Sequence, residues 1–177
     1  MSRDQYLASE DSALLRNALE GRSGERCLEI GAGNGGNLVP LAGRFQVVVG
    51  TDLVRPSMTD WKGAGADFVL ADGASCLREE AFDLVAFNPP YVRAPIEDKA
   101  VDGGASLEVP KKFLLEALRA VKKGGKIVFV LNDEAEPEDF RRVARAKGFA
   151  LRPLATKRLF FEELTAYLAS PVETPLS

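Results

Sequence analysis

Short runs of apolar residues alternate along this chain with segments in which apolar residues recur every three or four positions. The short runs have the length and the β-branched or aromatic content of strands, and they cover residues 27–30, 47–52, 67–70, 82–87, 126–131, 149–155 and 159–168. Several are almost continuously apolar, as expected for parallel strands that are covered on both faces. The pattern predicts an α/β fold built on a mostly parallel sheet.

Segments with helical periodicity separate most of these strands. The first covers residues 13–20 and has Ser9 as its expected cap. A longer helix is expected from Pro110 to the glycine pair at 124–125, and another begins at Pro137. The last two strands follow one another without a helix, which indicates an antiparallel pair. We therefore predict a Rossmann-like sheet of seven strands with a C-terminal antiparallel hairpin.

Composition limits the chemistry that the chain can carry out. Its 46% hydrophobic and 28% charged residues are typical of one domain over residues 1–177, with an N-terminal helix region at 1–22 and a frayed tail at 170–177. No run is long enough to span a membrane and none resembles a signal peptide, so we expect a cytoplasmic protein. Histidine is absent, which removes Ser-His-Asp machinery and the usual general base. The spacing of Cys27 and Cys76 predicts no metal site, and a net charge of −3 provides no broad attraction for nucleic acid.

A glycine-rich segment, Gly31-Ala32-Gly33-Asn34-Gly35-Gly36, follows the first strand and precedes a short expected helix at 38–41. Glycines let the backbone approach a ligand where a Cβ atom would clash, and a helix N-terminus adds free amide hydrogens. The spacing fits the dinucleotide pattern G-x-G-x-x-G and also E-x-G-x-G-x-G, a pattern associated with S-adenosylmethionine sites. The second pattern begins at Glu29, and a buried carboxylate without a partner is costly, so a role for Glu29 in the site is favoured.

Acidic residues also end the next two strands. Asp52 lies about 20 positions beyond the glycine-rich turn, where an acid accepts hydrogen bonds from ribose hydroxyls, although a helix-capping role is the alternative. Asp72 repeats the arrangement after the third strand. Together with Glu29 they indicate a site for the amino-acid end, the ribose and the adenine amino group of one ligand.

The segment Asn88-Pro89-Pro90-Tyr91 follows the fourth strand directly. The prolines fix φ near −65° and lack amide hydrogens, and Pro89 also keeps Asn88 out of helical angles, so the segment turns outward as a stiff corner. Ligands of open α/β sheets bind beyond the carboxyl ends of the strands. A polar side chain on such a corner can hold a substrate, and a surface turn is the alternative interpretation.

E-x-G-x-G-x-G after the first strand and N-P-P-Y after the fourth resemble the class I S-adenosylmethionine-dependent methyltransferases, and the resemblance covers nearly the whole chain. Within that class, N-P-P-Y marks enzymes that methylate a planar amino group. Residues 6–12, the spacing from Glu29 to Asn88 and the Gly103-Gly104 loop are most similar to the short archaeal and eukaryotic branch of the HemK-related protein glutamine methyltransferases. Members of that branch methylate the glutamine of the Gly-Gly-Gln motif in class I release factors, together with a small zinc-binding activator protein.

The resemblance implies a role for each motif residue. Cofactor contacts would come from Ser12, Glu29, Gly31, Gly33, Asp52, Asp72, Gly73 and Asn88, and the catalytic acceptor site from Asn88, Pro89, Pro90 and Tyr91. The chain departs from the family where a further glycine is expected near Leu107 and where the connection from Asp52 to Asp67 is short for a full helix.

The resemblance also implies partners. A protein substrate and the activator are expected, with neither a membrane nor a nucleic acid as direct substrate. If the strand at 67–70 lies at a sheet edge, it exposes unpaired backbone groups, and Phe68, Val69 and Leu70 include no lysine or proline to protect it. We expect the activator to dock there.

Three alternatives remain open at this point. A methyltransferase acting on adenine N6 or guanine N2 of a nucleic acid would meet the same planar amino group in a flipped base. A nicotinamide-dependent oxidoreductase would use the G-x-G-x-x-G pattern. A binding scaffold would hold the cofactor without consuming it.

Overall fold

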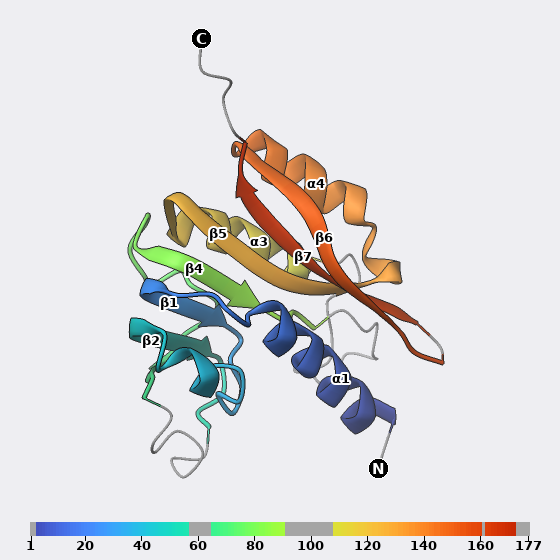
Figure 1. Cartoon of the computed structure of the whole chain (residues 1–177), viewed down its shortest axis with the longest axis horizontal. Coiled ribbons are helices and arrows are strands. Elements are labelled where there is room, and N and C mark those ends of the chain that lie inside the picture. The colour runs from blue at the N-terminus through green and yellow to red at the C-terminus, as the bar shows by residue number, and fades with distance from the viewer. Residues whose placement is uncertain (1–2, 57–64, 91–107, 161, 173–177) are drawn as a thin grey trace.

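One seven-stranded sheet organises the computed structural model of this chain, which describes residues 3–56, 65–90, 108–160 and 162–172 (Figure 1). The strand order is β3-β2-β1-β4-β5-β7-β6, and β7 runs antiparallel to both of its neighbours while the other pairs are parallel. The strands are β1 (Gly24–Ile30), β2 (Phe45–Asp52), β3 (Asp67–Leu70), β4 (Phe82–Phe87), β5 (Val121–Asn132), β6 (Phe149–Arg158) and β7 (Glu163–Pro171). This confirms the mostly parallel sheet, the C-terminal antiparallel hairpin and the edge position of β3.

Helices cover both faces of the sheet. On one face pack α3 (Glu108–Ala120) and α4 (Pro137–Ala146), which bury Leu114 and Phe140 in a core that includes the stacked rings of Phe87 and Phe129, with centroids 4.7 Å apart. On the other pack α1 (Arg3–Ala18) and the 3₁₀ turn η1 (Val39–Leu41). No helix among the described residues is long and apolar enough to cross a membrane. A sheet buried from both sides explains why the strands are almost continuously apolar.

The first helix differs from the prediction. It begins at Arg3, so Ser9 lies inside the helix and is not its cap, and it ends at Ala18. The sequence has no glycine or proline between Arg3 and Ser9, so nothing stops the helix from extending upstream of the serine. The helix predicted at 38–41 is only the three-residue turn η1.

The second difference lies between α3 and β5. The helix ends at Ala120, and the glycine pair at 124–125 lies within β5, which starts five residues earlier than predicted at Val121. The pairing of β4 with β5 shifts between Phe82 and Leu84, and Gly124 takes a φ of +85° that favours glycine. The glycines therefore form an irregularity in a strand and do not end the helix.

The hairpin also has different limits from those predicted. β6 extends to Arg158 and β7 begins only at Glu163. Ser170 and Pro171, predicted as part of a frayed tail, pair with β6. Residues 173–177 of that tail lie outside the described residues.

The strand order reverses between β1 and β4, which are hydrogen-bonded neighbours with Ile30 opposite Phe87. The residues that follow these strands, Gly31 and Asn88, therefore leave the sheet side by side. In open α/β sheets this reversal point is where ligands bind.

Candidate active site at the carboxyl ends of β1 and β4

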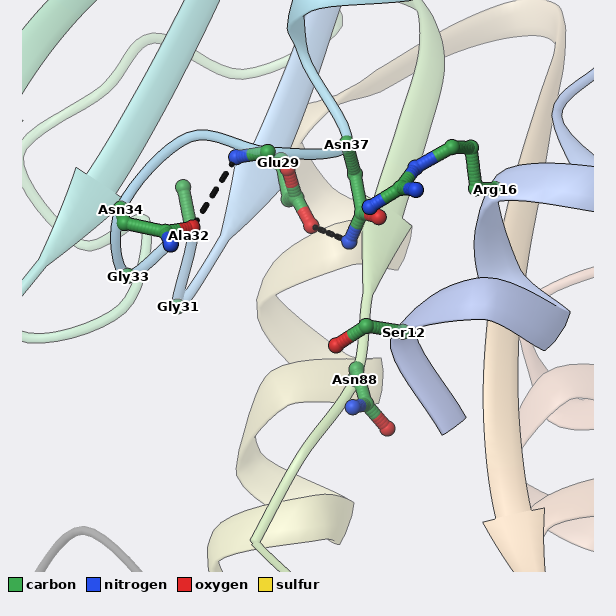
Figure 2. Close-up of a pocket in the computed structure, with 10 residues that line it drawn as sticks. Ser12, Arg16, Glu29, Gly31, Ala32, Gly33, Asn34, Asn37 and Asn88 are labelled. Carbon is green, nitrogen blue, oxygen red and sulfur yellow. Dashed lines mark hydrogen bonds between the residues drawn. The ribbon is translucent and has the colours of Figure 1, made fainter. Parts of the chain in front are cut away.

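A cavity of roughly 140 Å³ lies at this reversal point, between α1, the glycine-rich turn and the residue after β4. Its lining is polar, and most of its side chains can form hydrogen bonds (Figure 2). The lining residues are Ser12, Arg16, Glu29, Gly31, Ala32, Gly33, Asn34, Gly36, Asn37 and Asn88. The structure thus brings together five of the residues predicted from the sequence: Ser12, Glu29, Gly31, Gly33 and Asn88.

Glu29 points from β1 into this cavity and is only 2% exposed. The Asn37 side-chain amide donates a 2.8 Å hydrogen bond to Glu29 Oε1, while Oε2 has no hydrogen-bond partner in the described part of the chain. Burial raises the pKa of Glu29 to about 8, against the opposing influence of the Asn37 hydrogen bond and of Arg16. Glu29 therefore has an acceptor oxygen available for a cationic group, and a cation would favour its ionised form.

Asp52 holds the glycine-rich turn in place. The Gly33 amide donates to Asp52 Oδ2 and the Val54 amide to Oδ1, each at 2.9 Å. Gly31 has a φ of +70°, and a Cβ atom there would lie 3.1 Å from the Phe113 ring. The backbone angle therefore favours glycine at this position, and a Cβ atom would also crowd the Phe113 ring of α3. Each Asp52 oxygen retains a lone pair for a hydroxyl donor.

The turn itself does not offer the free helix N-terminus expected from the sequence. The Gly35 amide donates to the Ala32 carbonyl at 2.8 Å, and the Gly36 amide donates to Asn34 Oδ1 at 3.1 Å. Only the short turn η1 follows, so a helix dipole has little length over which to develop. Side chains, rather than a helix end, supply most of the polarity of this cavity.

Asn88 leaves β4 with its side chain in the cavity, beside Ser12 of α1 (Figure 2). Its Oδ1 atom is buried and has no hydrogen-bond partner among the described residues. Pro89 is buried and Pro90 is half-buried, whereas Tyr91 lies outside the described residues. An unpaired buried carbonyl oxygen is costly unless a ligand completes its hydrogen bond.

Asp72 and Gly73 do not line the cavity. Asp72 lies after β3 with its side chain 58% exposed and forms a 2.6 Å ion pair with Lys112 of α3. Gly73 is buried with a φ of +65°, and an added Cβ atom would lie 1.9 Å from Glu116 Oε2. The φ angle favours glycine at 73, and the Glu116 carboxylate occupies the space where a Cβ atom would be, which the sequence pattern did not show.

Sequence reasoning missed Arg16, Asn34 and Asn37. Arg16 lies one helical turn after Ser12 on α1, and Figure 2 shows its guanidinium extending over the cavity toward Asn37. The four-residue spacing from Ser12 is a signal in the sequence, but it has meaning only if the helix already includes Ser12. Asn37 gave no signal, because its partner, Glu29, is identified only from the fold.

Several known proteins with similar sequences or structures are methyltransferases, although no protein-family model matches the chain. Methyltransferase HEMK2 of Mus musculus is 28% identical, with 82% of this chain and 80% of that protein covered. A Methanocaldococcus jannaschii protein with a provisional assignment as a protein N5-glutamine methyltransferase is 27% identical, with 90% and 88% covered. The E. cuniculi Mtq2-Trm112 complex, responsible for methylation of the eRF1 translation termination factor, matches with a TM-score of 0.76 and 26% identity over 92% of this chain and 96% of that one.

Proposed function

We propose that this chain, which is a HemK-related class I methyltransferase, transfers a methyl group from S-adenosylmethionine to the side-chain nitrogen of a glutamine in a class I release factor. The buried, unpaired Oδ1 atom of Asn88 carries the proposal. It lies at the sheet's reversal point, in the same cavity as the glycine-rich turn, so an acceptor held by Asn88 is next to a ligand held by that turn.

The residues of the cavity, together with Asp52, which lies next to it and binds the Gly33 amide, match the polar groups of S-adenosylmethionine. Glu29 Oε2 accepts from the α-ammonium group, and the Arg16 guanidinium faces the carboxylate. Gly31 and Gly33 line the cavity without a Cβ atom, which leaves room for the ligand against the backbone. Asp52 accepts from the ribose hydroxyls. Ser12 adds a hydroxyl from α1.

Methyl transfer needs the acceptor nitrogen oriented more than it needs a base. The nitrogen of a carboxamide is a weak nucleophile because its lone pair is delocalised into the carbonyl group. Asn88 Oδ1 and the Pro89 carbonyl each accept one of its N–H groups, which holds the nitrogen in place. S-adenosylmethionine supplies an electrophilic methyl group on its sulfonium. As the nitrogen bonds to the methyl carbon, the methyl–sulfur bond would break, S-adenosylhomocysteine would leave, and the nitrogen would lose one proton to water, which suits a chain without histidine. Orientation of bound reactants supplies up to roughly 7–11 kcal/mol of barrier reduction.

The names of the relatives support a protein glutamine as acceptor. One relative is assigned to protein N5-glutamine methylation, and the E. cuniculi complex acts on the eRF1 termination factor. A nucleic-acid substrate has no comparable support, because the chain carries a net charge of −3 and a phosphate backbone requires positive charge.

A small zinc-binding activator is part of the proposal, docked on the free edge of β3. Within the part of the chain that the structure describes, that strand has a hydrogen-bonded neighbour on one side only, β2. Leu70 at its end is 61% exposed, and Leu53 and Val54, which follow the neighbouring strand, are 64% and 68% exposed. An added strand would satisfy the backbone groups of the edge and cover these apolar side chains. Phe68 packs instead against the core on the α1 face, so it contributes less to the docking surface than the sequence alone predicts.

Asn88→Ala tests the acceptor role. Because Asn88 is assigned to the acceptor, the variant should bind S-adenosylmethionine with an affinity close to that of the wild type while kcat falls about 10²-fold, by analogy with the loss of one oxyanion-hole donor. Asn17→Ala, an exposed position on α1, is the matched control and should leave both quantities unchanged. A folded Asn88→Ala variant with wild-type kcat would refute the role.

A further inference from the structure

One face of α3 holds the loop that follows β3. Lys112, Glu116 and Arg119 are spaced by four and three residues, which puts them on the same side of the helix. Lys112 forms the 2.6 Å ion pair with Asp72, Glu116 accepts from the Ala74 amide, and the Arg119 guanidinium donates to the Ala74 carbonyl. Both polar backbone groups of Ala74 are therefore bound by side chains of one helix.

Glu116 has the most restrictive of these contacts. Its side chain is 13% exposed, and its Oε2 atom lies 2.5 Å from the amide nitrogen of the fully buried Ala74. A buried amide must find an acceptor, and no backbone carbonyl supplies one here among the described residues. Gly73 leaves just enough space for the carboxylate. Gly73 and Glu116 thus together fix one conformation of this loop.

The same helix also contacts the rest of the site. Phe113 of α3 lies against Gly31 of the glycine-rich turn and makes an edge-to-face contact with Phe87, with ring centroids 6.1 Å apart. Phe87 directly precedes Asn88. One rigid element therefore supports the glycine-rich turn, the strand that carries Asn88 and the Asp72 loop, so a change at Glu116 can be confined to the loop while the other two contacts remain.

We propose that Glu116 is a positioning residue for the adenine end of the cofactor, which it serves by fixing the loop that presents the Asp72 carboxylate. The inference rests on the proposed binding of S-adenosylmethionine, and it adds that Asp72, a cofactor contact expected from the sequence, accepts from the adenine amino group. Glu116 itself does not touch the ligand. Its effect on binding passes through Asp72, and this indirect route distinguishes it from a residue that only stabilises the fold.

A double-mutant cycle measures this route. Calorimetry with S-adenosylmethionine should show that Glu116→Ala weakens binding about tenfold in the wild-type background, the loss expected for one hydrogen bond to a charged group. In the Asp72→Ala background, which has no side-chain acceptor at 72, the same substitution should change the affinity less than about twofold, because the coupled contact is already lost. Glu116→Gln retains one acceptor oxygen and should recover most of the affinity. Glu108→Ala, exposed in the first turn of α3, is the control.

A second measurement distinguishes a specific effect of Glu116 on the Asp72 contact from a general loosening of the cofactor site. S-adenosylhomocysteine carries the adenine amino group, whereas S-inosylhomocysteine has an oxygen in its place that cannot donate to Asp72. The wild-type chain should prefer the first compound, and Glu116→Ala should reduce that preference several-fold while leaving the affinity for the second nearly unchanged. If Glu116→Ala does not fold, Glu116→Gln should show a smaller loss of preference in the same direction.

Equal losses of affinity in both Asp72 backgrounds, or equal losses for both analogues, would overturn the inference and leave Glu116 as a residue of the fold. Unchanged affinity and preference in both Glu116 variants would overturn it as well. A wild-type chain that binds none of these nucleosides would overturn the proposed function, and the inference with it. The two failures are therefore distinguishable.

Discussion

Replacing Glu29 by glutamine should change how stability depends on pH. Glutamine has the same shape and still accepts the hydrogen bond from Asn37, but it carries no charge. Burial raises the pKa of Glu29 from 4.5 to about 8 when the cavity holds no ligand. Because one pKa unit corresponds to about 1.4 kcal/mol, ionising Glu29 in the folded chain costs on the order of 5 kcal/mol more than in the unfolded chain.

The direction of the effect follows from which state holds the proton. Below about pH 4.5 both states are protonated, and above about pH 8 both have lost the proton. Between these values only the folded chain holds it, so a rise in pH favours unfolding, with a slope of up to about 1.4 kcal/mol per pH unit. The glutamine variant lacks this contribution. Its stability relative to the wild type should therefore increase by several kcal/mol across the window.

Urea unfolding followed by circular dichroism, without cofactor, at several pH values from about 5 to about 8 measures this difference. The cofactor adds a second readout, because its ammonium group favours the ionised carboxylate. Binding to the wild type near neutral pH should release close to one proton, detected by calorimetry in buffers with different ionisation enthalpies. The glutamine variant should release none and bind more weakly. Parallel stability profiles for the two chains would refute the assignment of a buried, protonated Glu29 facing the ligand.

Three further substitutions test the ribose contact and the proposed activator surface. Asp52→Ala should weaken S-adenosylmethionine binding by about 1.5–3 kcal/mol, since it removes a charged acceptor from the ribose and releases the Gly33 amide. A calorimetric affinity equal to that of the exposed control Asp67→Ala would contradict this prediction. Leu70→Lys should abolish activator binding in a pull-down while leaving cofactor affinity within about twofold, because the lysine charge would lose its water at the proposed interface but does not enter the core. Phe68→Lys should in addition destabilise the chain, because Phe68 packs on the core. Retained activator binding by Leu70→Lys would place the interface elsewhere.

The sequence predicted the parts of the site that depend on local chemistry. A stiff Asn88-Pro89-Pro90 corner after a buried strand, and glycines after the strand that carries Glu29, are visible in the order of residues. The proximity of Gly31 and Asn88, by contrast, follows only from the observed parallel pairing of β1 with β4.

Contacts between segments that are distant in the chain could not be predicted from the sequence. Glu116 binds the amide of Ala74, 42 residues away, and a backbone amide has no residue type for a pattern to detect. Arg16 lies over the cavity only because α1 extends upstream of Ser12 and packs against the sheet. The glycines at 124–125 have two physically reasonable uses, a helix end or a strand irregularity, and only the pairing of β5 with β4 decides between them.

Mass spectrometry of a methylated release factor tests the central claim most directly. A class I release factor is incubated with S-adenosylmethionine, this chain and the activator protein, and its peptides are then sequenced. The account predicts one added methyl group on the glutamine of the Gly-Gly-Gln motif, absent when that glutamine is replaced and strongly reduced with Asn88→Ala. A folded, cofactor-binding wild-type chain that leaves this glutamine unmodified, in the presence of the activator, would contradict the account.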